Sequence, residues 1–118
     1  MILLVEDDED VREMLELAFR SNGYPVESAC DGAGALAVLE RGRPCLIILD
    51  LVMPMMTGWE VIAQMKQKKL GDIPVCVISA LGGSVPAQAI ASFCKPFNVR
   101  ELIDVAARYC THAPAAAS

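Results

Sequence analysis

The segment CLIILDLVMPMMTG, residues 45–58, ends an unbroken apolar run on a single acid, Asp50. Residues 46–49 include no polar side chain, a pattern typical of a strand that is buried on both faces of a parallel sheet. A carboxylate at the end of such a strand loses its hydration or keeps its proton unless a partner compensates its charge. The segment therefore predicts a buried parallel strand over residues 45–50 and a functional reason for Asp50.

Apolar runs and helix-period segments alternate along the rest of the chain. Pro25 favours an edge position for its strand, and Thr57 with Glu60, like Asn98 with Glu101, marks the start of a helix. We expect strands over residues 1–5, 24–29, 45–50, 73–80 and 92–95. We expect helices over residues 8–23 and 32–42, from 57 to the 66–69 region, and over 98–109, with a poorly marked segment between the last two strands.

These strands and helices predict an α/β fold, a doubly wound five-stranded parallel sheet with helices on both faces. Such sheets bind ligands outside the carboxyl ends of their strands, at the topological switch point. The polar residues that follow the predicted strands are therefore the candidate site.

Composition bounds the class of protein. The 118 residues, 54% of them hydrophobic, provide the core of one domain, which we place at residues 1–110 with a disordered tail over 111–118. A net charge of −5 with scattered cations argues against direct nucleic-acid binding, and no apolar run approaches the ~20 residues of a membrane span. The five cysteines are odd in number, lack metal-ligand spacing and lie mostly in apolar runs, which indicates buried thiols in a reducing, cytoplasmic protein.

Charged and hydroxyl residues stand at four predicted strand ends: Glu6, Asp7 and Asp8 after the first, Asp50 at the third, Ser79 at the fourth and Lys95 after the fifth. Two acids 4 Å apart repel each other by up to ~4 kcal/mol at an effective dielectric near ~20, so a cation is expected among them. Oxygen ligands with an open position for phosphate favour Mg²⁺. A carboxylate held beside a metal and a lysine can accept a phosphoryl group, and Asp50 is the candidate acceptor.

Four motifs carry a family resemblance: ILLVEDDEDVRE, LIILDLVMPMMTGWE, VISA and KPFNVREL. Together, and in this order, they resemble a response-regulator receiver domain of two-component signalling, similar to the chemotaxis receivers, over residues 1–110. The resemblance implies the flavodoxin-like (βα)5 fold. It also implies a stand-alone regulator, a phosphorelay intermediate or one domain of a larger protein.

The resemblance assigns roles to individual residues. Asp50 matches the phosphorylated aspartate, which takes its phosphoryl group from a phosphohistidine of a sensor histidine kinase or phosphotransfer protein. Ser79 and Lys95 match the hydroxyl and the cation that contact the phosphoryl group. The metal ligands implied are Asp7, Asp50, the main-chain carbonyl of Val52 and, through water, Glu6. The domain would also catalyse its own dephosphorylation and signal through contact with a downstream effector protein, and a homodimer remains open.

Other interpretations stay open. The acids after the first strand also suit a helix start, and Ser79 or Lys95 alone has no specific meaning. A pseudo-receiver would keep the fold and bind a partner regardless of phosphorylation. A phosphohydrolase with an aspartyl nucleophile is disfavoured, because Val52 stands where such enzymes use a second acid.

Three departures from the family pattern bear on output. The short interval between Ser79 and Lys95 predicts a shortened or unravelled fourth helix. Ser92, followed by Phe93, occupies the position of an aromatic switch residue. Val52 and Leu81 are apolar where polar side chains position water in faster receivers, so we expect slow self-dephosphorylation.

Two cysteines, Cys30 and Cys94, are expected to be packing residues.

Overall fold

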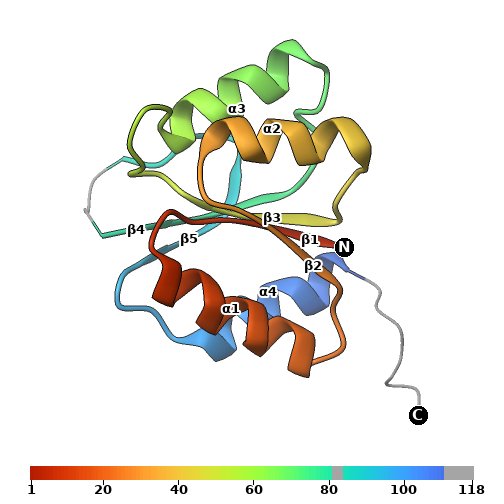
Figure 1. Ribbon diagram of the computed structural model, residues 1–118, viewed down its shortest axis with the longest axis vertical. Helices are drawn as coiled ribbons and strands as arrows, with labels where there is room; N and C mark the ends of the chain where they lie inside the picture. Colours follow the sequence, from red (N-terminus) through yellow and green to blue (C-terminus); the bar gives the residue numbers. More distant parts are fainter. Residues whose placement is uncertain (81–83, 111–118) are drawn as a thin grey trace.

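A single parallel sheet forms the centre of the molecule, as Figure 1 shows. The computed structural model describes residues 1–80 and 84–110. The strand order is β2-β1-β3-β4-β5, the order of a doubly wound sheet whose switch point lies between β1 and β3. The strands are β1 (Ile2–Val5), β2 (Val26–Ala29), β3 (Leu46–Asp50), β4 (Val75–Ser79) and β5 (Ala89–Cys94). The helices are α1 (Glu9–Ser21), α2 (Gly32–Arg41), α3 (Gly58–Gln67) and α4 (Val99–Tyr109).

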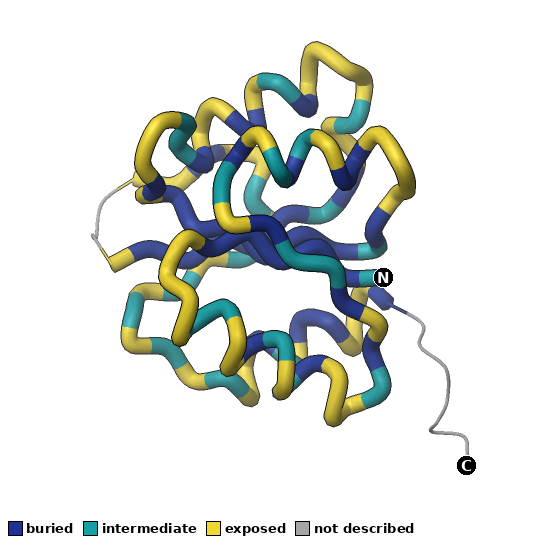
Figure 2. Tube along the Cα trace, in the orientation of Figure 1, coloured by how far each residue is buried: buried dark blue, intermediate teal, exposed yellow. Residues whose placement is uncertain are grey.

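Helices cover both faces of the sheet. Figure 1 places α2 and α3 on one face and α1 and α4 on the other. Successive residues of β1 alternate between the two cores, with Leu3 and Val5 packing on the α2–α3 side and Ile2 and Leu4 on the α1–α4 side. All four are fully buried, as are their neighbours in β3, and the central strands are the dark centre of Figure 2. The apolar run that ends on Asp50 is thus a strand between two helical layers.

Helix starts follow the expected capping chemistry. The Thr57 hydroxyl accepts from the N–H of Glu60, and the Glu60 carboxylate accepts from the N–H of Thr57, which completes a capping box at α3. The Asp8 carboxylate caps α1, and the Asn98 side chain caps α4. The predicted strands and helices are confirmed with shifts at their ends, and the strand after Pro25 is an edge strand.

The connection from β4 to β5 agrees, in its described residues, with the unravelled form of the expected fourth helix. Its described residues, 80 and 84–88, form no helix, so the shortened fourth helix is not seen in this part of the chain. β5, however, begins at Ala89, earlier than the expected residue 92. Glycines and a proline disfavour a helix here, and residues 87–88 form a turn directly before β5. Leu81 and the predicted tail over 111–118 lie outside the described residues.

The cysteines correct another expectation. Cys45 and Cys110 form a disulfide with a Cα–Cα distance of 5.3 Å, so they are not free thiols. Cys30 and Cys94 are exposed and therefore are not packing residues, whereas Cys76 is a buried free thiol as expected. The pairing could not be read from the sequence, because it depends on the end of α4 returning to the start of β3. Among residues 1–80 and 84–110, no helix combines the length and apolar character needed to cross a membrane.

Candidate functional site

The candidate site lies at the carboxyl edge of the sheet, where the sequence predicted it. Asp50 is the last residue of β3, and Ser79 is the last residue of β4. Glu6 directly follows β1, and Lys95 directly follows β5. Because β3 pairs with both β1 and β4, and β4 pairs with β5, the parallel register brings these four ends to one edge of the sheet.

Lys95 connects two buried carboxylates. Its Nζ lies 2.8 Å from Oε1 of Glu6 and 3.2 Å from Oδ2 of Asp50. Glu6 is fully buried and Asp50 is 2% exposed, whereas the Lys95 side chain is 21% exposed. The lysine therefore approaches from the solvent side, and its positive charge lies against both buried carboxylates.

Main-chain groups fix the orientation of both carboxylates. The N–H of Asp8 donates to Oε2 of Glu6 over 3.0 Å. The N–H of Val52 donates to Oδ1 of Asp50, also over 3.0 Å. Directly after β5, the N–H of Lys95 donates to the carbonyl of Ser79 over 2.8 Å, which sets the position of the lysine relative to the end of β4. Each acid thus has one oxygen bound to the backbone and the other facing the lysine.

The pKa values of Glu6 and Lys95 are both raised, but for different reasons. Burial raises the pKa of Glu6 above its usual value, and the nearby Asp50 adds to the rise, although Lys95 and the N–H of Asp8 oppose it. Burial lowers the pKa of Lys95, but its pairing with the two carboxylates outweighs that effect and the net pKa is raised. Lys95 is therefore a permanent cation at neutral pH, and Glu6 is an acid whose ionised form depends on a neighbouring cation.

Three carboxylates could share a metal ion. One oxygen from each of Glu6, Asp7 and Asp50 lies within 4.8 Å of the others. Asp7 is exposed, and Oε1 of Glu6 is a buried atom that receives no hydrogen bond of good geometry from the described residues, despite its ionic contact with Lys95. An all-oxygen set with an open, solvent-facing side fits Mg²⁺. Val52, whose carbonyl is the fourth ligand predicted from the sequence, lies in the loop directly after Asp50.

Two residues of the site escaped the sequence analysis. Arg12, in the first turns of α1, donates from Nη1 to the carbonyl of Glu6 over 3.1 Å and fixes the chain after β1. Gly58, the first residue of α3, lies so close to β3 that a Cβ there would be 2.7 Å from the carbonyl oxygen of Asp50. The position of Gly58 directly after the helix cap Thr57 could have drawn attention to it. The contact between Gly58 and the end of β3, however, depends on how the chain folds and cannot be read from the sequence.

The expected switch region has an unusual arrangement. Ser92 is exposed, and the neighbouring Phe93 packs with the core on the α1–α4 side of the sheet. An aromatic side chain is therefore present next to the expected position but on the opposite face of β5.

Comparisons with known proteins agree with this architecture. The family described as "Response regulator receiver domain" matches residues 2–107. Transcriptional regulatory protein PrrA of Mycobacterium tuberculosis is 37% identical over 108 residues, which cover 86% of this chain and 46% of PrrA. Response regulator MprA of Mycobacterium leprae is 38% identical over 108 residues, covering 86% of this chain and 47% of MprA. The chain spans about half the length of these curated relatives.

Solved structures have the same fold. TrrA of Thermotoga maritima, crystallised in complex with Mg²⁺-BeF, matches with a TM-score of 0.81 and 28% identity over 92% of this chain and 97% of its own. The chemotaxis response regulator CheY4 of Vibrio cholerae matches with a TM-score of 0.79 and 31% identity over the same shares of 92% and 97%. With its sheet order, its acidic edge and these matches, the chain belongs to the response-regulator receiver-domain family of two-component systems.

Proposed function

We propose that this receiver domain accepts a phosphoryl group on Asp50 from a phosphohistidine and signals through a change in protein contacts. The observation that carries the proposal is the position of Lys95 Nζ between Glu6 and Asp50, at the edge of the sheet where ligands of this fold bind. In this scheme Glu6, Asp7, Asp50 and the carbonyl of Val52 hold Mg²⁺. When bound, the metal neutralises charge on the transferring phosphoryl group.

The residues of the chain divide the reaction between them. The Asp50 oxygen that faces Lys95 attacks phosphorus, and the bond from phosphorus to the imidazole nitrogen of the donor breaks. The other oxygen stays bound to the N–H of Val52, which holds the carboxylate in line for the attack. Lys95 transfers its contact from Asp50 to a phosphoryl oxygen, and the hydroxyl of Ser79 donates to another. Those changes at the ends of β4 and β5 are the first structural consequences of phosphorylation.

Partners and location follow from the same proposal. The donor is a sensor histidine kinase or a phosphotransfer protein in the cytoplasm, and the receiver domain comprises residues 1–110. The reader of the phosphorylated state is an effector domain or protein, without direct nucleic-acid contact by the receiver itself.

Intact mass spectrometry after incubation with acetyl phosphate tests the proposal. The expected result is one phosphoryl adduct that requires Mg²⁺, is lost with EDTA and is absent in Asp50→Asn. An adduct of equal yield in Asp50→Asn would overturn the assignment. Phosphotransfer from histidine kinases provides a second donor for the same comparison.

A pseudo-receiver is the second candidate, because the β4–β5 connection lacks a helix in its described residues and so departs from the family's usual output surface. This alternative requires that neither acetyl phosphate nor a kinase labels the wild-type chain, and that partner binding is the same for wild type and Asp50→Asn.

A further inference from the structure

The absence of a helix among the described residues between β4 and β5 leaves part of the α2–α3 face of the sheet without a cover. Ser92 and Cys94, which alternate along β5 with the Ala91 and Phe93 side chains that pack on the opposite side, are exposed, whereas Ala89 packs with the core on the α2–α3 side. The chain crosses this region through residues 84–88, of which only Pro86 is buried. The part of this region at Val75 and Gln88 is separate from the phosphoacceptor site, because it adjoins the start of β4, whereas Cys94 pairs with Ser79 at the carboxyl end of that strand.

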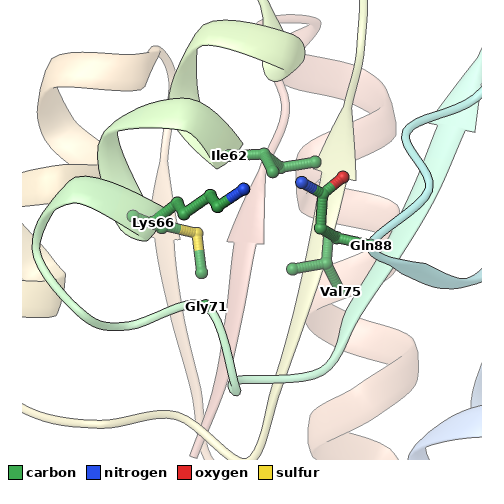
Figure 3. A pocket seen from close by; sticks show the side chains of 6 residues that line it. Ile62, Lys66, Gly71, Val75 and Gln88 are labelled. Atoms are coloured by element: carbon green, nitrogen blue, oxygen red, sulfur yellow. The ribbon is translucent and has the colours of Figure 1, made fainter.

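A small cavity opens beside this uncovered strand, as Figure 3 shows. Its volume is about 150 Å³, and its lining residues are Ile62, Met65, Lys66, Gly71, Val75 and Gln88. Ile62, Met65 and Val75 are almost fully buried and form an apolar floor. Lys66 from α3 and Gln88 from the segment before β5 extend their polar ends toward each other across the opening.

The size of the cavity selects the kind of occupant. Metabolite sites usually have volumes of ~300–1,000 Å³, well above this one. A dry apolar cavity of ~150 Å³ holds a group the size of benzene. The cavity therefore fits a single leucine or phenylalanine side chain, which is how one protein segment anchors itself on another.

The charge around the opening selects the character of that segment. The protein carries a net charge of −5, yet Lys66, Lys68 and Lys69 stand together at the end of α3. None of the three forms an ion pair with a residue that the structure describes. The nearest acid in the following loop, Asp72, is already paired with Arg43. Lysines at a helix C-terminus also stabilise the helix, but that role leaves their ammonium groups free to pair.

We propose that this cavity is the docking site of an acidic peptide segment of a partner protein. One large apolar side chain of the segment fills the space over Ile62, Met65 and Val75, and an adjacent carboxylate pairs with Lys66. Gln88 hydrogen-bonds the backbone of the segment. The surface is present whether or not Asp50 is phosphorylated, so it provides a constant docking contact distinct from the phosphoryl switch.

Selection from a random peptide library displayed on phage tests this inference on the whole chain. We expect the selected peptides to contain a leucine or aromatic residue flanked by acids. Synthetic versions of these peptides should bind wild type and Asp50→Asn equally, and should bind Lys66→Glu about tenfold more weakly. Arg108→Glu is the matched control, because it reverses an exposed charge near the end of α4, on the other face of the sheet, and should leave binding unchanged.

Three results would overturn the proposal: selected peptides without acidic residues, equal peptide binding to Lys66→Glu and Arg108→Glu, or no selected peptide that binds at this cavity. Concentration-dependent self-association that Lys66→Glu abolishes, measured by sedimentation velocity, would also overturn it in favour of a second copy as the occupant. Because Asp50→Asn is expected to bind normally, failure of phosphorylation leaves this test intact.

Discussion

Replacement of Gly58 by alanine is a stringent test of how closely α3 packs on the end of β3. Gly58 has a helical backbone without a positive φ, so by local preference alone alanine should stabilise the protein. The structure predicts the opposite. An added Cβ would lie 2.7 Å from the carbonyl oxygen of Asp50, 2.8 Å from Cα of Leu51 and 2.9 Å from Cδ2 of Leu51.

The magnitude follows from two opposing terms. Overpacking of a close contact costs about 1–3 kcal/mol, because the two nearest atoms belong to the backbone of Asp50 and Leu51 and cannot move aside like a flexible side chain. The loss of backbone freedom in the unfolded chain returns about 0.4–1 kcal/mol. At the middle of both ranges, the net effect of Gly58→Ala is a loss of about 1.3 kcal/mol in the free energy of unfolding. The displacement required also moves the Asp50 carbonyl, so phosphorylation should slow as well.

Urea unfolding followed by the fluorescence of Trp59, the single tryptophan, measures this change. Gly42→Ala is the matched control, since a Cβ at Gly42 would meet no atom within 4 Å and its φ of −172° is open to any residue. We expect the control to unfold at the same urea concentration or a slightly higher one. Equal or greater stability of Gly58→Ala would refute the close approach of α3 to β3.

Three further perturbations follow from the same structure. Glu6→Gln should raise the free energy of unfolding at pH 7, because it removes a buried acid whose pKa is raised in the folded chain. Between pH 4.5, the ordinary pKa of a glutamate, and the raised pKa of Glu6, the folded chain holds more protons than the unfolded chain. The stability of the wild type therefore rises as the pH falls through that window. Urea titrations at several pH values should show this pH dependence flattened in the variant, and an unchanged slope would contradict it. Ellman's reagent at pH 8 should react quickly with the exposed thiols of Cys30 and Cys94 in the native protein. Burial raises the pKa of Cys76 to about 12, so its thiol should react only after unfolding. Three fast-reacting thiols in the native protein would disprove the burial of Cys76. Val52→Ala should accelerate loss of the phosphoryl group, followed by intact mass over time, because the Val52 side chain is 48% exposed beside the acceptor; an unchanged rate would rule out shielding.

Much of the fold was predictable from the sequence because local signals agreed with the tertiary structure. The apolar run before Asp50, the capping box at Thr57 and the proline before β2 each have a direct physical meaning, and each is present in the structure. The meeting of Glu6, Asp50 and Lys95 was also predictable, since the carboxyl ends of parallel strands lie at one edge.

The features that the sequence did not predict depend on contacts between distant segments. The disulfide joins Cys45 and Cys110, which are 65 residues apart and have no spacing motif. The exposure of Cys94 depends on the lack of a helix over β5 in the described residues, although the apolar surroundings suggested a packing role. The close approach of Gly58 likewise depends on how α3 returns to the sheet.

The central claim is that Asp50 is the residue that receives the phosphoryl group, and borohydride trapping tests it most directly. Reduction of an acyl phosphate with borohydride converts the modified aspartate into homoserine, whose position tandem mass spectrometry then reads in the digested chain. After incubation with acetyl phosphate and Mg²⁺, we expect homoserine at Asp50 alone and none in samples treated with EDTA. Homoserine at Asp7 or Asp8, with Asp50 unmodified, would contradict it.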